Sequence, residues 1–227
     1  SKILLFCNPH NPSGRVMRRE ELEAVAEIAI EEDLLIVSDE IHFDLVYPGA
    51  RHIPIASLSP EVEARTITLT SASKGFNIAG LRCAVAVFGS ADLKARFMEF
   101  PRHLRGGIGS LGIMATEAAW RHAEPWLEDV LAYLEANRDF TVEFVRKEMP
   151  GIRYVPAEST YFAWMDCRAL EFEGSAGRFF LERARVGLSD GPSFGDPGTG
   201  FARLNFATSR AVLSEALGRM AEALRGR

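Results

Sequence analysis

Hydrophobic residues fall in short blocks over the first hundred positions. Each block is followed by polar or turn-forming residues, and the blocks are residues 3–7, 34–37, 66–70 and 83–88. Between the first two blocks, residues 18–33 predict a helix with an apolar face formed by Leu22, Val25, Ile28 and Ala29. Short apolar strands that alternate with helices or loops predict an α/β layer with a mostly parallel sheet.

The pattern changes after a glycine-rich stretch at residues 106–109. Helical sequence follows to about His122, and Pro125 starts a long amphipathic helix that ends before Pro150. The remainder predicts a small α+β unit, with strands near 160–166 and 203–206, helices near 174–185 and 210–225, and a loop at 191–200. We therefore predict two domains, residues 1–105 and residues 106–227.

Composition narrows the class of protein. Hydrophobic residues at 47% and charged residues at 25% are typical of a folded chain, and the net charge of −5 argues against nucleic-acid binding. No apolar run approaches the length of a membrane span, so we expect no membrane partner. Cys7, Cys83 and Cys167 are too far apart for a CxxC site, which suggests reduced thiols in a cytoplasmic protein.

The first predicted strand begins almost at the first residue of the chain. A central parallel strand needs a neighbour on both sides, and no earlier element supplies one here. We therefore expect this chain to be the C-terminal part of a longer protein.

Polar residues follow three of the predicted strands. Asn11 comes after the first, Asp39 after the second, and Ser71, Ser73 and Lys74 come after the third. In a parallel sheet these positions share the carboxyl edge, where open α/β sheets bind ligands. Their recurrence predicts a binding site at that edge.

Lys74 is the most informative of these residues. The chain has four lysines against twenty-two arginines, and Lys74 lies at a strand end among small residues. A partly buried lysine near other cations loses its proton easily and becomes a nucleophile. The alternative is a surface lysine in a serine-rich loop, and the residue alone leaves both open.

Asp39 and the serines also allow two interpretations. Asp39 follows an apolar strand, so we expect its carboxylate to lie near the interior, either in a site or as a helix cap or ion-pair partner. Ser71, Ser73 and Arg82 offer hydroxyls and a guanidinium that suit a phosphate dianion, or they form a turn with an ordinary ion pair.

Arg203 lies among apolar residues on a predicted strand, where an unpaired charge would be costly. Its partner is either a substrate carboxylate or an internal Asp or Glu, and the sequence leaves both open. The five histidines show no metal-ligand spacing, so we expect no metal site.

Taken in order, these clusters resemble the fold-type I pyridoxal-phosphate (PLP) enzymes, the aspartate aminotransferase superfamily. The matching stretches are Asn11–Gly14, Ser38–His42, Ser71–Lys74 and Phe201–Asn205. A narrower resemblance to the cystathionine β-lyase-type C–S lyases is carried by Ser38–His42, Arg51–Pro54 and Ser73–Gly80. The resemblance covers essentially all 227 residues and implies a partial PLP-transferase large domain followed by a small α+β C-terminal domain.

The resemblance also implies a role for each candidate residue. Lys74 would hold PLP covalently and then shuttle the Cα proton, and Asp39 would pair with the pyridinium nitrogen. Arg203 would bind the substrate α-carboxylate. The other implied cofactor contacts are Asn11 at the 3′ oxygen of the ring, His42 where many members have a tyrosine that bonds the same oxygen, and Ser71, Ser73 and Arg82 at the phosphate.

The N-terminal two-fifths of the family has no counterpart in this chain. That part normally supplies the phosphate turn, the aromatic residue that stacks on the ring and much of the dimer contact. The resemblance implies that the full-length protein is a homodimeric enzyme acting on a small-molecule amino-acid substrate. Because the N-terminal part is missing, we expect this chain alone to be inactive.

Three functions remain open at this point. The first is a PLP-dependent C–S β-lyase that cleaves cystathionine or a related L-cysteine S-conjugate to a thiol, pyruvate and ammonia. The second is a PLP-dependent class I/II aminotransferase that uses the same residues. The third is a regulator or binding domain without catalysis.

Overall fold

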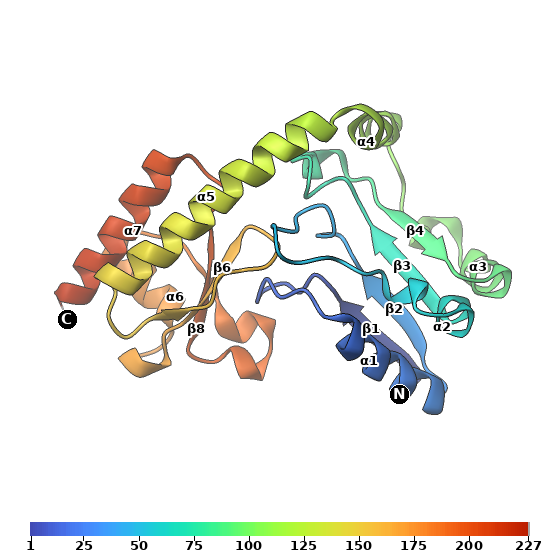
Figure 1. Ribbon diagram of the computed structural model, residues 1–227, viewed down its shortest axis with the longest axis horizontal. Coiled ribbons are helices and arrows are strands. Elements are labelled where there is room, and N and C mark those ends of the chain that lie inside the picture. The colour runs from blue at the N-terminus through green and yellow to red at the C-terminus, as the bar shows by residue number, and fades with distance from the viewer. Residues whose placement is uncertain (227) are drawn as a thin grey trace. The chain divides into compact units, whose positions relative to one another are not determined.

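The computed structural model describes residues 1–226, apart from the side chains of residues 102 and 105, and contains two compact units (Figure 1). Unit 1 consists of Ser1–His10 and Arg15–Asp129. Unit 2 consists of Asn11–Gly14 and the chain from Val130 onward. Each unit has its own four-stranded sheet.

The sheet of unit 1 has the strand order β1-β2-β3-β4. Its strands are β1 Ile3–Cys7, β2 Leu35–Asp39, β3 Thr66–Thr70 and β4 Val85–Phe88. The first three strands are parallel, and β4 pairs antiparallel with β3. The predicted α/β layer with a mostly parallel sheet is confirmed, with strand ends within two residues of those predicted.

Four α-helices accompany this sheet, α1 Arg19–Glu31, α2 Pro60–Ala64, α3 Ala91–Met98 and α4 Ser110–His122. Figure 1 shows α1 running beside β1 and β2. Leu22, Ala26 and Ala29 of α1 pack with Phe6 and Ile36 of the sheet in one buried core. Burial of this helix face supplies most of the helix stability, because isolated helices of this length are marginal in water.

The predicted apolar face of α1 is wrong at one position. Ile28 is 56% exposed, whereas Leu22, Ala26 and Ala29 are at most 4% exposed. Ile28 lies six residues after Leu22, which places it about 120° around the helix from that residue. Ala26 takes its place because it lies about 40° from Leu22.

Side chains of β2 alternate between the two faces of the sheet. Ile36 and Ser38 are fully buried on the face that α1 covers, and Glu40, just beyond the strand, continues this series at 4% exposed. Asp39 has the opposite parity and pairs with Cys7 of β1, on the same face as Leu5. Leu5 is 80% exposed, so this second face is open in unit 1.

Unit 2 contains an antiparallel sheet in the order β5-β6-β8-β7. Its elements are β5 Arg153–Tyr154, β6 Phe162–Asp166, α6 Ala176–Phe179 with the π-helical turn Phe180–Ala184, β7 Ser189–Asp190, β8 Phe201–Asn205 and α7 Arg210–Arg225. The predicted α+β unit is confirmed. Helix α5, Glu124–Glu148, begins in unit 1 and carries the chain into unit 2.

Asn137 ties α5 to the turn between β8 and α7. Its side chain is fully buried, and Nδ2 donates to the carbonyl oxygens of Phe206 and Thr208, each at 2.9 Å. Its Oδ1 accepts from Arg210 Nε at 2.9 Å. All of these groups are therefore satisfied without water, as buried polar groups must be.

The two units divide after Asp129, while the predicted domain boundary after residue 105 stays a prediction. Helix α4 lies with unit 1 because Gly112 packs directly on the loop before β4. A Cβ at Gly112 would lie 2.5 Å from the Leu81 carbonyl oxygen.

Two general expectations concern membranes and thiols. Within residues 1–226, no helix is both long and apolar enough to cross a bilayer. Cys7, Cys83 and Cys167 form no disulfide within residues 1–226, and burial raises the pKa of the Cys167 thiol to about 12. Such a thiol is unreactive, because the thiolate is the nucleophile.

Candidate active site

The ends of β1, β2 and β3 meet at one edge of the unit 1 sheet. Asp39 is paired with Cys7 on one side and with Leu69 on the other. Ser71 and Lys74 follow Leu69 by two and five residues, so the structure brings the Asp39 and Ser71–Lys74 clusters to the same edge. Asn11 belongs to unit 2, so its predicted place at this edge stays a prediction.

Lys74 is half-buried, and no described Asp or Glu forms an ion pair with it. The next residue, Gly75, is buried against Asp44, and a Cβ there would lie 2.7 Å from Asp44 Cβ. Phe76 is 8% exposed and stacks on Trp126 with ring centroids 6.0 Å apart. The lysine is therefore carried by a loop whose backbone is fixed by close packing.

Asp44 lies between this loop and α4. Trp120 Nε1 donates to Asp44 Oδ2 at 3.4 Å. Burial raises the pKa of the Asp44 carboxyl above its usual range, and the hydrogen bond from Trp120 opposes that shift. The Asp44 side chain therefore packs against the loop at Gly75 and is hydrogen-bonded to α4 through Trp120.

The serines are hydrogen-bonded within the β3–β4 loop. Ser71 Oγ donates to the Cys83 carbonyl oxygen at 2.5 Å and accepts from the Ser73 backbone N–H at 3.0 Å. The two hydroxyls are also 2.5 Å apart. Arg82, in the same loop, is exposed and has a positive φ of 51°. Two hydroxyls and a guanidinium thus lie in one loop with Lys74, and their predicted contact with a phosphate stays a prediction.

The expected burial of Asp39 is wrong. Its side chain is exposed, and Oδ1 accepts from the Ile41 backbone N–H at 3.1 Å. The reason is the parity of β2, since Ser38 and Glu40 occupy the buried face and Asp39 faces the opposite way. The carboxylate is therefore accessible at the sheet edge without the cost of burial.

His42 lies in the turn after β2, where its side chain is 3% exposed. Its carbonyl oxygen accepts from the Leu45 backbone N–H at 2.9 Å. The predicted contact of His42 with the cofactor stays a prediction.

Sequence reasoning missed a buried polar cluster beside Asp39. Glu40 Oε2 accepts from His52 Nε2 at 2.8 Å, Glu40 Oε1 accepts from Ser38 Oγ at 2.8 Å, and Asn8 Nδ2 lies 3.5 Å from His52 Nδ1. The parity of Glu40 with Ile36 was an available signal, because a carboxylate on a buried face requires a partner. That partner, His52, lies twelve residues after Glu40, and this separation matches no helix or strand period, so the pattern could not identify it.

In unit 2, the structure brings Arg203 and Asn11 together. Arg203 Nη1 donates to Asn11 Oδ1 at 2.7 Å, and Nη2 donates to Ser189 Oγ at 3.1 Å. The guanidinium carbon also lies 4.0 Å from the Phe162 ring centroid and 4.7 Å from that of Phe194. Two neutral oxygens and two aromatic rings thus fix the orientation of this cation.

No ion pair joins Arg203 to an acidic residue in the part of the chain that the structure describes. Burial lowers the pKa of its guanidinium from the usual value, while nearby Tyr161 opposes this shift. Of the two partners that the sequence left open, the internal Asp or Glu is therefore excluded for residues 1–226. A half-buried, oriented guanidinium without an anion is suited to a carboxylate ligand.

Comparison with known proteins links these features to a family. Residues 1–220 match the family described as aminotransferase class I and II. The cystathionine β-lyase of Corynebacterium glutamicum is 39% identical, with 97% of this chain and 59% of that protein covered. The cystathionine β-lyase PatB of Bacillus subtilis is 35% identical, with coverages of 98% and 58%.

A solved structure gives the same result. The crystal structure of cystalysin from Treponema denticola, which contains a PLP cofactor, superposes with a TM-score of 0.94 at 35% identity. The match covers 99% of this chain and 58% of cystalysin. The chain thus spans less than three-fifths of the length of these relatives.

Proposed function

The chain belongs to the aminotransferase class I and II family, and from this premise we propose that the full-length protein is a PLP-dependent C–S β-lyase. By full-length protein we mean this chain with whatever further sequence its gene encodes. The substrate would be an L-amino acid with a sulfur leaving group at Cβ, such as cystathionine or a related cysteine S-conjugate. The products would be a thiol, pyruvate and ammonia.

The observation that carries this proposal is the donor set at the edge of the unit 1 sheet. It combines a half-buried lysine that no described acidic residue pairs with, an exposed carboxylate, and two hydroxyls and a guanidinium in one loop. The lysine amine can react with the aldehyde of PLP, and the carboxylate can pair with its pyridine nitrogen. The hydroxyls and the guanidinium can bind its phosphate. The residues present therefore fit the cofactor by their chemistry.

Lys74 and Asp39 would act on the reacting centre. PLP, when bound, supplies an electron sink for the carbanion at the substrate Cα. The Lys74 amine would remove the Cα proton, and the thiolate would leave from Cβ. The Asp39 carboxylate would hold the proton on the pyridine nitrogen. The released aminoacrylate then takes up water to give pyruvate and ammonia.

The other residues would bind and orient. Ser71, Ser73 and Arg82 would hold the phosphate, and Arg203 would bind the substrate α-carboxylate with its guanidinium. Asn11 offers its amide N–H to the 3′ oxygen of the ring, because its Oδ1 is already used by Arg203. His42 is proposed as a further contact of that oxygen, as the family resemblance implies.

Cofactor attachment and product formation test the proposal separately. The full-length protein is mixed with PLP, reduced with borohydride and digested, and the mass of the Lys74 peptide is measured beside Lys74→Ala. We expect a PLP adduct on Lys74 and pyruvate from L-cystathionine, with both lost in Lys74→Ala. An unmodified Lys74 peptide in the wild-type protein contradicts the proposal.

An aminotransferase is the second candidate, and the family description favours it. Both reactions begin with the same proton transfer by Lys74, so the candidate residues do not separate them. The separating measurement adds a keto acid to the reaction. Formation of a new amino acid without pyruvate from the donor would establish transamination.

We also propose a cytoplasmic homodimer. The three free cysteines support a reducing compartment. Large apolar side chains on unit 1 support an interface, since Phe100, Leu104, Leu111 and Met114 are each at least 58% exposed. Light scattering of the full-length protein tests the dimer, and a monomer mass contradicts it.

A further inference from the structure

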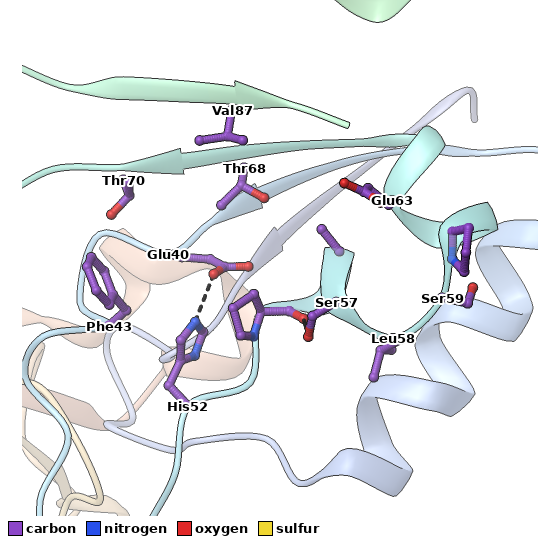
Figure 2. A pocket seen from close by; sticks show the side chains of 13 residues that line it. Glu40, Phe43, His52, Ser57, Leu58, Ser59, Glu63, Thr68, Thr70 and Val87 are labelled. Atoms are coloured by element: carbon purple, nitrogen blue, oxygen red, sulfur yellow. Dashed lines mark hydrogen bonds and ion pairs between the residues drawn. The ribbon is translucent and has the colours of Figure 1, made fainter. Parts of the chain in front are cut away.

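A buried polar cluster lies directly behind Asp39, on the opposite face of β2. Ser38, Glu40 and Asn8 are at most 4% exposed, and the His52 side chain is 8% exposed. Figure 2 shows His52 and Glu40 facing each other beside a pocket of about 580 Å³, with Thr68 and Glu63 also at its wall. The proposed chemistry uses none of these side chains.

The hydrogen bonds of this cluster fix the orientation of each group. The Met17 backbone N–H donates to Asn8 Oδ1 at 2.9 Å, so the Asn8 amide nitrogen is the group that faces His52 Nδ1. A carboxylate only accepts, so His52 Nε2 carries a proton and donates it to Glu40. The second oxygen of Glu40 is held by Ser38.

The cluster also holds the backbone on both sides of Asp39. Ser38 and Glu40 are its two chain neighbours, and the Asn8 backbone N–H donates to the Asp39 carbonyl oxygen at 3.1 Å. The Glu40 backbone N–H donates to the Leu69 carbonyl oxygen at 2.8 Å. The cluster and these backbone bonds thus hold Ser38, Glu40 and Asn8, the residues next to Asp39 in sequence or hydrogen-bonded to its backbone.

We infer that the Glu40–His52 pair is a positioning device for Asp39. The pair would not touch the cofactor, because the Glu40 side chain, to which His52 is hydrogen-bonded, lies on the face of the sheet opposite to Asp39. It holds the end of β2 so that the Asp39 carboxylate stays at the distance and angle that a ring nitrogen requires. This inference rests on the function proposed above and names two further residues of the same site.

The variant Glu40→Gln tests the inference, and Glu63→Gln is its matched control. Both replace one carboxylate at the same pocket by an amide of equal size, but Glu63 is exposed and outside the cluster. In the full-length protein we expect the PLP dissociation constant of Glu40→Gln to rise by about tenfold, since the loss of a charged hydrogen bond has that magnitude. Glu63→Gln should stay within about twofold of wild type.

A double-mutant cycle with Asp39→Asn separates positioning from a general loss of stability. If Glu40 acts through Asp39, Glu40→Gln weakens PLP binding by less than about twofold once Asp39 is already Asn, because the two changes are then not additive. A full tenfold loss in both backgrounds overturns the inference. Equal affinity of Glu40→Gln and wild type overturns it as well.

A replacement variant covers the case in which Glu40→Gln does not fold, and PLP binding by the wild-type protein separates failure of this inference from failure of the proposed function. If Glu40→Gln does not fold, Ser38→Ala takes its place, because it removes only one hydrogen bond to Glu40 and retains the charge. Wild-type protein that fails to bind PLP at Lys74 refutes the proposed function itself. Wild type that binds PLP, with additive effects of Glu40→Gln and Asp39→Asn, refutes the positioning role alone.

Discussion

The polar groups of the two units are held in different ways. In unit 1, Lys74 and Asp39 make no ion pair with any residue that the structure describes, and their positions follow from the backbone of the sheet edge and the packed loop. In unit 2, Arg203 is held by its own side-chain contacts with Asn11, Ser189 and two aromatic rings. A small backbone change should therefore damage the first site, whereas the second should respond to the loss of individual side chains.

Among changes outside the proposed cofactor and substrate contacts, the largest effect is expected from Gly75→Ala. The added Cβ would lie 2.7 Å from Asp44 Cβ, so either the segment around Asp44 or the backbone that carries Lys74 must shift, and we expect the latter to move. A displacement of about 1 Å at a reacting group costs on the order of 10²-fold in kcat/KM. This loss in kcat/KM is measured from steady-state pyruvate formation by the full-length protein. Gly80→Ala is the control, since nothing lies within 4 Å of its Cβ, and equal losses in both variants would refute the packing argument.

Arg203→Lys should raise KM for the amino-acid substrate by about tenfold, while kcat changes little. Lysine retains the charge but loses the planar fork that binds a carboxylate with two hydrogen bonds. Arg168→Lys is the comparison variant, because Arg168 also lies over an aromatic ring but has its own partner in Asp166. A larger rise in KM for Arg168→Lys would contradict the assignment of Arg203.

Ser189→Ala should raise KM by a smaller factor, about threefold, because one hydrogen bond from the Arg203 guanidinium to a neutral hydroxyl is lost while Asn11 and the rings still hold that guanidinium. Initial rates over a range of substrate concentrations give this value. An unchanged KM would mean that Asn11 and the two aromatic rings are sufficient to fix the guanidinium without Ser189.

The smallest effect concerns stability and pH. Burial raises the pKa of Asp44, so its ionised form opposes folding once the pH exceeds the unfolded value of 3.8. Asp44→Asn should therefore be slightly more stable than wild type at neutral pH, with the difference shrinking as the pH falls through the raised pKa and vanishing below the unfolded value. Thermal melts from pH 3 to pH 7 measure it, and a constant difference would exclude titration of Asp44 as the cause.

Most of the fold could be predicted, because the patterns are local. The period of two in β3 and the caps of α7 define Thr66–Thr70 and Arg210–Arg225 as the structure has them. The exposure of Asp39 was predicted wrongly because a strand end indicates an edge but not a face. Only the parity with Ile36 and Ser38 determines that face.

Contacts between distant residues could not be predicted. Asn11 and Arg203 are 192 residues apart in sequence, and their hydrogen bond depends on the placement of residues 11–14 in unit 2. The Glu40–His52 pair depends on the irregular path of the chain between β2 and α2. A charged side chain among apolar residues, such as Arg203 or Glu40, indicates that a partner is needed. Only the fold identified Asn11 and His52 as those partners.

The proton on His52 Nε2 also gives the protein an internal reporter. Because it is buried and donated to a carboxylate, its exchange with water is slow enough for a separate signal in a proton NMR spectrum. The chain has only five histidines, which simplifies the assignment of that signal. The state of the sheet edge behind Asp39 can thus be followed in intact protein, without substrate and before any turnover.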